Sequence, residues 1–499
     1  MGEPQYLSSP NLALAQHVFN LASPASDPTS KQTSLTTLQN AIREDKMAPL
    51  YAYLSHPQAG KLNASGEGSA ALSPTISRQN TQGAPSPGNL LRRTSSINSP
   101  SIVGVLGADR DTSVELPWDE KLYEELKAAN EKELAEIQKE EDEAVEQAGE
   151  TEIQNARGKR AELYARIGDK DKAIAEFEKL LDKTSILGTK IDIVLAIIRL
   201  GLFFDDKLLV KRTVDRASQL VDSGGDWDRR NRLKAYQGLH LLTIRAHAQA
   251  APLLLDSLST FTSTELCTYS NLVVYATLAG SVALSRKDFK TRVVDAPEIR
   301  AVFGSDADTN ALGGDGDDAE MKDSASAQPG AAVNLTTLAS GSADASAQAK
   351  AEPKIDFRPL ARMISSLYSG NYSTFFTALG AVEAHFLSTD RYLLEHKSWY
   401  VREMRLRAYS QLLQSYKIVS LVSMADQFGV SVDWLDRDLA RFVAGKRLSC
   451  RIDRVRGVIE TERVDSKNRQ YGDVVQRGDQ LITKLQKYGQ VVRLRGSER

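Results

Sequence analysis

At 499 residues the chain is too long for a single compact core, and its length predicts two or three domains. Its 63 basic and 65 acidic residues almost cancel, to a net charge of -2, which excludes a general attraction to nucleic acid or to an anionic membrane. The two cysteines, Cys267 and Cys450, cannot build a disulfide framework or a cysteine-based metal site, and they indicate a reducing compartment.

The N-terminus does not resemble a secretory signal, because no basic segment followed by a long apolar run occurs in it. The most apolar stretch, Ile191 to Phe204, is interrupted by Asp192 and Arg199 and is too short to span a bilayer. We therefore expect no membrane partner and a location in the cytoplasm and nucleus.

Two segments stand apart by composition. Residues 60–113 are rich in Ser, Pro and Gly, and residues 305–352 are rich in Ala, Gly, Ser and Asp. Neither segment has enough apolar surface to offset the entropy lost on ordering, so we predict two disordered insertions. Residues 1–59, before the first insertion, are predicted to form an N-terminal helical segment.

Residues 114–304 are predicted to be helical throughout. From Trp118 to about Arg160 the sequence is dense in charge and carries one narrow apolar row, which predicts a single long solvated helix. From Ala161 onward the pattern is that of paired helices of the tetratricopeptide type, with small residues where two helices approach and Tyr164 and Phe177 between units. Such units bury their core against neighbours and leave a curved surface free for partners.

After the second insertion, residues 353–416 resume the helical pattern. Residues 417–465 then change character. A short helix from Leu421 to Phe428 is expected to end at Gly429, where a left-handed backbone costs glycine little, and Ser420 and Ser431 are expected to cap this helix and the next. Alternation around Cys450 and a second run at 458–461 predict two strands, and the order helix, helix, two-stranded wing is that of a winged helix.

Winged helices often read DNA, and the charges of this one argue against that use. The second helix is expected to turn Asp433, Asp436 and Asp438 outward alongside Arg437 and Arg441, and carboxylates at that position would repel phosphate. The wing is more basic, so a nucleic-acid-binding winged helix remains an alternative reading. We expect no nucleic acid partner.

Residues 466–499 are predicted to form a C-terminal helix with an apolar stripe. An isolated helix with such a stripe is unstable in water, so we expect it to dock on another surface. Docking on its own winged helix and docking in a bundle of subunits are both open. The residues of this candidate subunit interface are Val474, Val475, Leu481, Ile482, Leu485 and Tyr488.

Helical hairpins that lead into a winged helix resemble the PCI-domain family. The resemblance is carried in the winged helix by residues 435–442, 448–453 and 457–461. Upstream, residues 160–181, 226–234 and 284–290 resemble the proteasome regulatory-particle non-ATPase subunit seven family. The predicted fold class is therefore all-α with a small α+β winged helix: a right-handed solenoid of tetratricopeptide-like hairpins, then a PCI winged helix and a C-terminal helix.

The resemblance implies a non-catalytic structural subunit of the 19S regulatory-particle lid of the 26S proteasome. It implies a hetero-oligomer, whose partners would be the other PCI subunits of the lid and the lid deubiquitinase module, with the ATPase ring as a further candidate. By the same resemblance, the C-terminal helix would join a bundle of helices that nucleates assembly. The alternative within the same class is a PCI scaffold subunit of the COP9 signalosome.

The sequence offers little catalytic chemistry. The six histidines include no His-x-His pair and no metalloprotease motif, and no phosphate-binding loop occurs. His240 and His247 lie two turns apart on a predicted helix, but they lack a third ligand, which favours packing roles. We expect no catalytic residue, no cofactor and no metal. One regulatory candidate remains: Ser95 follows Arg92-Arg93 in the first insertion and suits a basophilic kinase.

Overall fold

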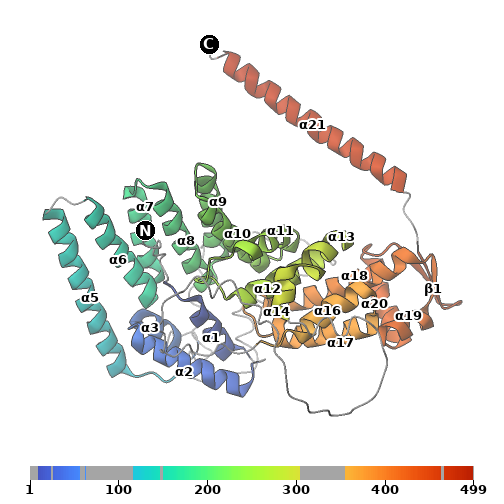
Figure 1. The fold of residues 1–499 in the computed structure, drawn as a ribbon, viewed down its shortest axis with the longest axis horizontal. Coiled ribbons are helices and arrows are strands. Elements are labelled where there is room, and N and C mark those ends of the chain that lie inside the picture. The colour runs from blue at the N-terminus through green and yellow to red at the C-terminus, as the bar shows by residue number, and fades with distance from the viewer. Residues whose placement is uncertain are drawn as a thin grey trace, which may run out of the picture. The chain divides into compact units, whose positions relative to one another are not determined.

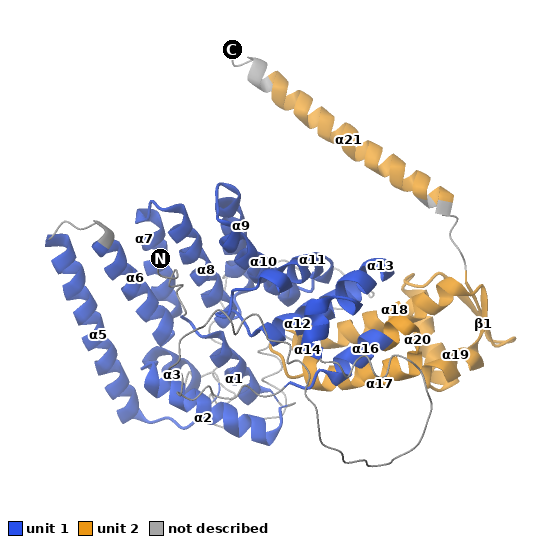
Figure 2. Ribbon diagram, viewed as in Figure 1, with its two compact units in different colours: residues 1–365 blue, residues 366–499 orange. Residues whose placement is uncertain are grey.

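The computed structural model describes residues 9–23, 26–56, 62, 116–146, 150–303, 355–461 and 466–497. The chain divides into two compact units, residues 1–365 and 366–499, which Figure 2 colours separately. The two predicted disordered insertions, 60–113 and 305–352, lie outside the described residues apart from Leu62, and so does Ser95. Within the described ranges, no helix combines the length and the apolar character that a membrane crossing needs.

Unit 1 begins with three short helices, α1 (Leu12–Ala22), α2 (Pro28–Glu44) and α3 (Ala48–Ser55). The side chain of Asn11 accepts a hydrogen bond from the backbone of Ala13 and caps α1, and α2 has proline at its start, where a missing N–H costs nothing. Their apolar faces form a core that includes Leu21, Leu38 and Ile42, and Leu116 and Leu126 from the start of the α5 region complete it.

The single long helix predicted from Trp118 to Arg160 is wrong. Two helices cover this region, α5 (Glu120–Glu146) and α6 (Glu150–Ile167), and they pack against each other. Arg157 and Arg160 of α6 both bind Glu141 of α5, so charges that looked solvated instead join the two helices.

The predicted solenoid of helical hairpins is confirmed. Figure 1 shows the helices that follow α6 side by side, and each packs on the next in the chain. They are α7 (Lys170–Lys183), α8 (Leu187–Phe203), α9 (Lys207–Asp222), α10 (Trp227–Thr243), α11 (His247–Ser257) and α12 (Tyr269–Ala283).

Two hairpins repeat one packing device. A Cβ at Gly201 of α8 would stand 2.6 Å from a methyl carbon of Val210 on α9, and a Cβ at Gly238 of α10 would stand 2.6 Å from a methyl carbon of Leu254 on α11. Real side chains do not come so close, so both positions require glycine. Small residues thus lie where the two helices of a hairpin approach each other, as expected for a tetratricopeptide-like unit.

Unit 1 closes with α13 (Arg286–Phe289), a single π-turn η2 (Lys290–Val294) and α14 (Pro297–Phe303), and of these η2 and α14 pack on α12. Helix α16 (Arg358–Ser369) spans the division between the units.

Unit 2 combines helices with a small sheet. The helical part comprises α17 (Tyr372–Val382), η4 (Glu383–Leu387), η5 (Leu394–His396) and α18 (Lys397–Ser415). Then follow β1 (Ile418–Ser420), α19 (Leu421–Phe428), α20 (Val432–Ala444), β2 (Cys450–Asp453), β3 (Val458–Thr461) and α21 (Ser466–Ser497).

The sheet has the antiparallel order β1-β3-β2, with Ile452 opposite Ile459. The predicted hairpin of β2 and β3 is present, and β1 is a third strand that the sequence did not predict. Strand β1 has only three residues and ends directly at the start of α19, so it is too short to show an alternating pattern.

Candidate subunit-interaction surfaces

The winged helix is fixed to the helical part of unit 2 by aromatic side chains. Phe428 of α19 is fully buried, and its ring centroid lies 4.6 Å from that of Tyr372 on α17 and 5.0 Å from that of Tyr409 on α18. Contacts of this kind add stability beyond area burial. The helical part and the winged helix therefore present their surfaces as one body.

The predicted capping roles of two serines are wrong, although both serines lie at the predicted positions. Ser420 and Ser431 occupy the positions before α19 and α20, but neither side chain makes a capping hydrogen bond. The end of α19 agrees with its prediction: Gly429 has φ +64° and its N–H bonds back to Asp426. A Cβ there would meet the Ser373 hydroxyl at 2.9 Å, so both the backbone and the space require glycine.

The carboxylates of α20 do not all face outward as expected. Asp433 is exposed, but Asp438 is buried, where it accepts a hydrogen bond from the Tyr409 hydroxyl (3.1 Å) and pairs with Arg405 (3.2 Å). Burial, together with the Asp438 carboxylate, raises the pKa of Tyr409. Asp438 is thus a structural residue that holds α20 against α18.

The basic wing is partly neutralised within the domain. Arg454 pairs with Asp436 of α20 at 2.8 Å, and Arg447 pairs with Glu403 of α18 at 2.6 Å. Arginines already held by carboxylates release less energy on meeting phosphate than free ones, because the existing pair must break. This arrangement favours a protein partner over a nucleic acid for the winged helix.

Helix α21 carries the predicted interface residues, and all six side chains are exposed. At about 100° per residue they lie, with Tyr471 and Val492, within an arc of about 140°. Rows seven residues apart, such as Val474, Leu481 and Tyr488, repeat along the helix. A stripe of this width suits a bundle in which several helices contact α21, and its role as an interface stays a prediction.

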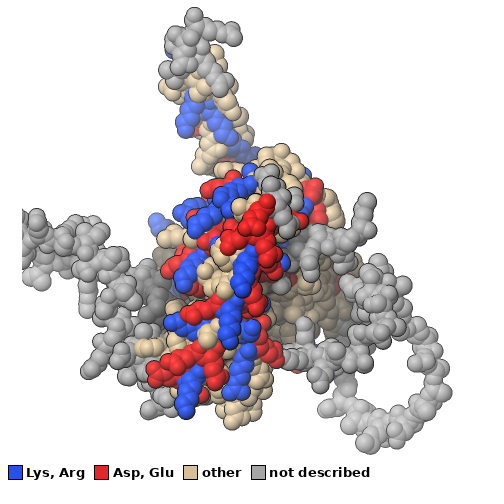
Figure 3. Space-filling model, turned by 90° about the vertical axis from the view of Figure 1, so that its left-hand side faces the viewer, with Lys and Arg blue, Asp and Glu red and all other residues tan. Residues whose placement is uncertain are grey.

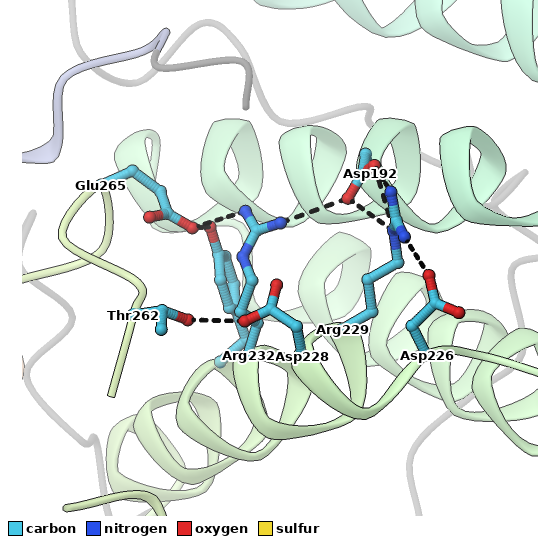
Figure 4. Close-up of polar contacts among 8 residues, drawn as sticks. Asp192, Asp226, Asp228, Arg229, Arg232, Thr262 and Glu265 are labelled. Carbon is cyan, nitrogen blue, oxygen red and sulfur yellow. Dashed lines mark hydrogen bonds and ion pairs between the residues drawn. The ribbon is translucent and has the colours of Figure 1, made fainter. Parts of the chain in front are cut away.

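In unit 1, a polar network joins α8, α10 and the loop before α12 (Figure 4). Arg229 and Arg232 of α10 both bind Asp192 of α8, and Arg232 also binds Glu265 at 2.7 Å. Glu265 further accepts a hydrogen bond from the hydroxyl of Tyr236, whose pKa is raised chiefly by its complete burial.

The network gives a structural role to residues 226–234, which the sequence analysis identified only by their resemblance to a family. Desolvation acts to lower the pKa of Arg232, but the Glu265 and Asp192 carboxylates outweigh it, and the pKa is raised. Arg232 is 3% exposed and fully charged, so it stabilises the stacking of two hairpins only while both carboxylates are present. The partner Asp192 is a residue that the sequence showed only as an interruption of an apolar run.

The two histidines considered as ligands are buried in the solenoid. His240 and His247 are 4% and 3% exposed, and burial lowers the pKa of His240. Among the described residues, no group of three or more His, Cys, Asp or Glu side chains could hold a metal ion. Cys450 is buried and Cys267 is half-buried, and neither forms a disulfide bond.

Two families match this chain. The family described as 26S proteasome subunit RPN7 matches residues 119–292, and the PCI domain matches residues 381–463. The first match covers α5 through α12 of the solenoid, and the second covers the winged helix with the helices before it.

Curated relatives match over most of the chain. The 26S proteasome regulatory subunit rpn7 of Schizosaccharomyces pombe is 35% identical over 487 residues, which cover 98% of this chain and 97% of the relative. The regulatory subunit RPN7 of Saccharomyces cerevisiae is 39% identical over 77% of this chain and 79% of its own length. By contrast, COP9 signalosome complex subunit 1 of Arabidopsis thaliana is 25% identical over 24% of this chain and 27% of its own.

Proposed function

This chain belongs to the Rpn7 family of 26S proteasome regulatory subunits, and we propose that it is a non-catalytic structural subunit of the lid of the 19S regulatory particle. There it would support lid assembly and, through it, ubiquitin-dependent protein degradation. The observation that carries the proposal is the nearly end-to-end alignment with a curated regulatory subunit.

The exposed surfaces support a role in assembly. Helix α21 offers an apolar stripe to a helical partner, and the winged helix offers a face whose arginines are already paired. We propose that the partners are other PCI subunits of the lid, the deubiquitinase module and the ATPase ring. Since the relatives are named regulatory subunits, we propose that catalysis belongs to the partners. We also propose that the chain acts in the cytoplasm and nucleus.

The proposal is tested by purifying a tagged chain from cells in mild salt and identifying its companions by mass spectrometry. We expect stoichiometric recovery of the lid and of the rest of the regulatory particle. Recovery of signalosome subunits alone would reject the lid assignment. Companions that vanish on nuclease treatment would instead favour the nucleic-acid alternative.

A further inference from the structure

Unit 1 contains a groove of about 940 Å³ that no part of the proposed lid function uses. It is bordered by the start of α1, the turn between α2 and α3, α5 and α6, and the loop from Thr262 to Glu265. The volume lies at the upper end of the ~300–1,000 Å³ typical of ligand clefts, and five separate parts of the chain contribute to it.

The lining of the groove is acidic. Two cations, Lys159 and Arg166, stand against six carboxylates, an excess of four negative charges. The carboxylates belong to Asp45, Glu133, Glu136, Glu140, Glu162 and Glu265. The chain as a whole is almost neutral, so this excess is a local property of the groove.

The two cations do not neutralise the remaining acids. Arg166 binds Glu133 at 2.5 Å, and Lys159 binds Glu140 at 2.7 Å. No other described residue forms an ion pair or a side-chain hydrogen bond with Asp45, Glu136 or Glu162. Burial raises the pKa of Asp45, an effect that Arg166 partly offsets, which is the behaviour of a carboxylate short of positive partners.

Glu265 adds a deeply placed acceptor at one end of the groove. Its side chain is nine-tenths buried, and Oε1 accepts hydrogen bonds from Arg232 and Tyr236. The other oxygen, Oε2, receives no hydrogen bond from any described residue, and Figure 4 shows it turned away from Arg232. Because Oε2 stays accessible in the groove lining, it can accept a hydrogen bond from a cation brought by a ligand.

The outer side of α5 differs from the groove. Figure 3, viewed from that side, shows acidic and basic side chains interspersed, which is typical of a solvated surface. The groove carboxylates are also spread over four segments, and among the described residues no three of them stand close enough to share one metal ion. Several separated negative charges along a groove match several separated positive charges on one flexible chain.

We propose that this groove binds a basic peptide segment of another protein, with one of the segment's arginine or lysine side chains bound at Glu265. The other cations of the segment would lie against Asp45, Glu136 and Glu162. A polyanion would be repelled by the same charges. The proposal does not depend on the lid assignment, because the groove residues and α21 are separate surfaces.

The test uses the full-length chain and a fluorescein-labelled nonapeptide of three Arg-Lys-Ser repeats, with binding followed by fluorescence anisotropy. We expect saturable binding that weakens with added salt. The double variant Glu136→Gln/Glu162→Gln should bind the peptide about tenfold more weakly, because two of the unpaired carboxylates are lost while the size of the side chains is kept.

The matched control is Glu124→Gln/Glu125→Gln, which removes the same charge from exposed positions elsewhere on α5. We expect its affinity to stay within about twofold of the unmodified chain. Circular dichroism melts verify that both variants are folded. The proposal is overturned if the unmodified chain fails to bind the peptide, if a Glu-Asp-Ser counterpart binds equally well, or if both double variants weaken binding equally.

Discussion

At the scale of single residues, the buried polar side chains carry the specific contacts of the solenoid. Arg232 reaches across from α10 to Asp192 on α8 and to Glu265 in the loop before α12. Such a pair of contacts adds less stability than apolar packing of the same volume, but it becomes strongly destabilising when one member is removed. The network therefore fixes which hairpins stack and in what register.

The first prediction concerns Arg232. Replacement by alanine leaves the largely buried Glu265 without a cation and leaves Asp192 with Arg229 alone, so Arg232→Ala should lower the opening free energy of α8 and α10 by about 3–5 kcal/mol. Amide hydrogen exchange measures this change helix by helix. Arg230→Ala, at an exposed position on the same helix, should change it by less than about 0.5 kcal/mol. If Arg232→Ala and Arg230→Ala lower the opening free energy equally, the ion pairs of Arg232 do not stabilise the stacking of α8 and α10.

His240 gives unit 1 a pH dependence of known sign. Burial lowers its pKa in the folded chain, whereas the pKa of the imidazole in the unfolded chain is about 6.5. The unfolded state therefore takes up the proton first, so the stability that neutral His240 provides is present above about pH 6.5 and is lost as the pH falls below it.

The second prediction follows from this sign. The melting temperature should fall between pH 7.5 and pH 5.0, and it should fall less in His240→Phe, which has a ring but no titratable group. A residual fall is expected from His17, whose pKa burial also lowers. If the melting temperature of His240→Phe falls as steeply as that of the unmodified chain, His240 does not contribute to the pH dependence of stability.

The roles of buried polar side chains were the hardest feature of the structure to predict from the sequence. Asp438 was expected on the surface because carboxylates usually lie there, yet Arg405 and Tyr409 on α18 make its burial favourable. Asp192 and Glu265 are 73 positions apart, and only the folded chain brings both to Arg232. Partners so distant in sequence leave no periodic signal.

At the scale of elements, apolar periodicity predicted most of the described helices. Helix α20 buries Leu435, Leu439 and Phe442, spaced at three and four residues, as expected of one helix face. The pattern could not distinguish one long helix from the hairpin of α5 and α6, because the same charges suit a solvated face and inter-helix ion pairs. The end of α19 was predicted correctly at Gly429, where φ is positive.

The third prediction compares two glycines of unit 2. Gly429 ends α19 with φ +64° against Ser373, so Gly429→Ala should destabilise the unit by about 1 kcal/mol or more. Gly380 lies inside α17 with open space around its missing Cβ, so Gly380→Ala should stabilise the unit by about 0.5–1 kcal/mol. Hydrogen exchange of α17 and α19 measures both changes. Shifts of the same sign would contradict this account of the two sites.

At the scale of the whole molecule, the chain combines two compact units with an exposed terminal helix. The order of hairpins, winged helix and terminal helix was predictable, because each part has its own sequence pattern and the order resembles a known family. The acidic groove was not predictable, since its carboxylates come from four separate segments. A surface formed by a single helix, such as the stripe of α21, could therefore be predicted from the sequence, whereas a surface formed by several segments could not.

The central claim is that the chain enters a larger assembly through the apolar stripe of α21. Two aspartates in the stripe would place charge where a partner buries apolar surface, so Leu481→Asp/Leu485→Asp should block entry. Gln476→Asp/Gln480→Asp adds the same charge to the opposite side of the same helix and should have little effect.

The measurement is the sedimentation of each tagged variant in a cell extract on a glycerol gradient, with companions identified in each fraction. We predict that the unmodified chain and the glutamine variant sediment with the regulatory particle, whereas the leucine variant stays at the top as a folded free chain. Sedimentation of the leucine variant with the intact particle would contradict the claim.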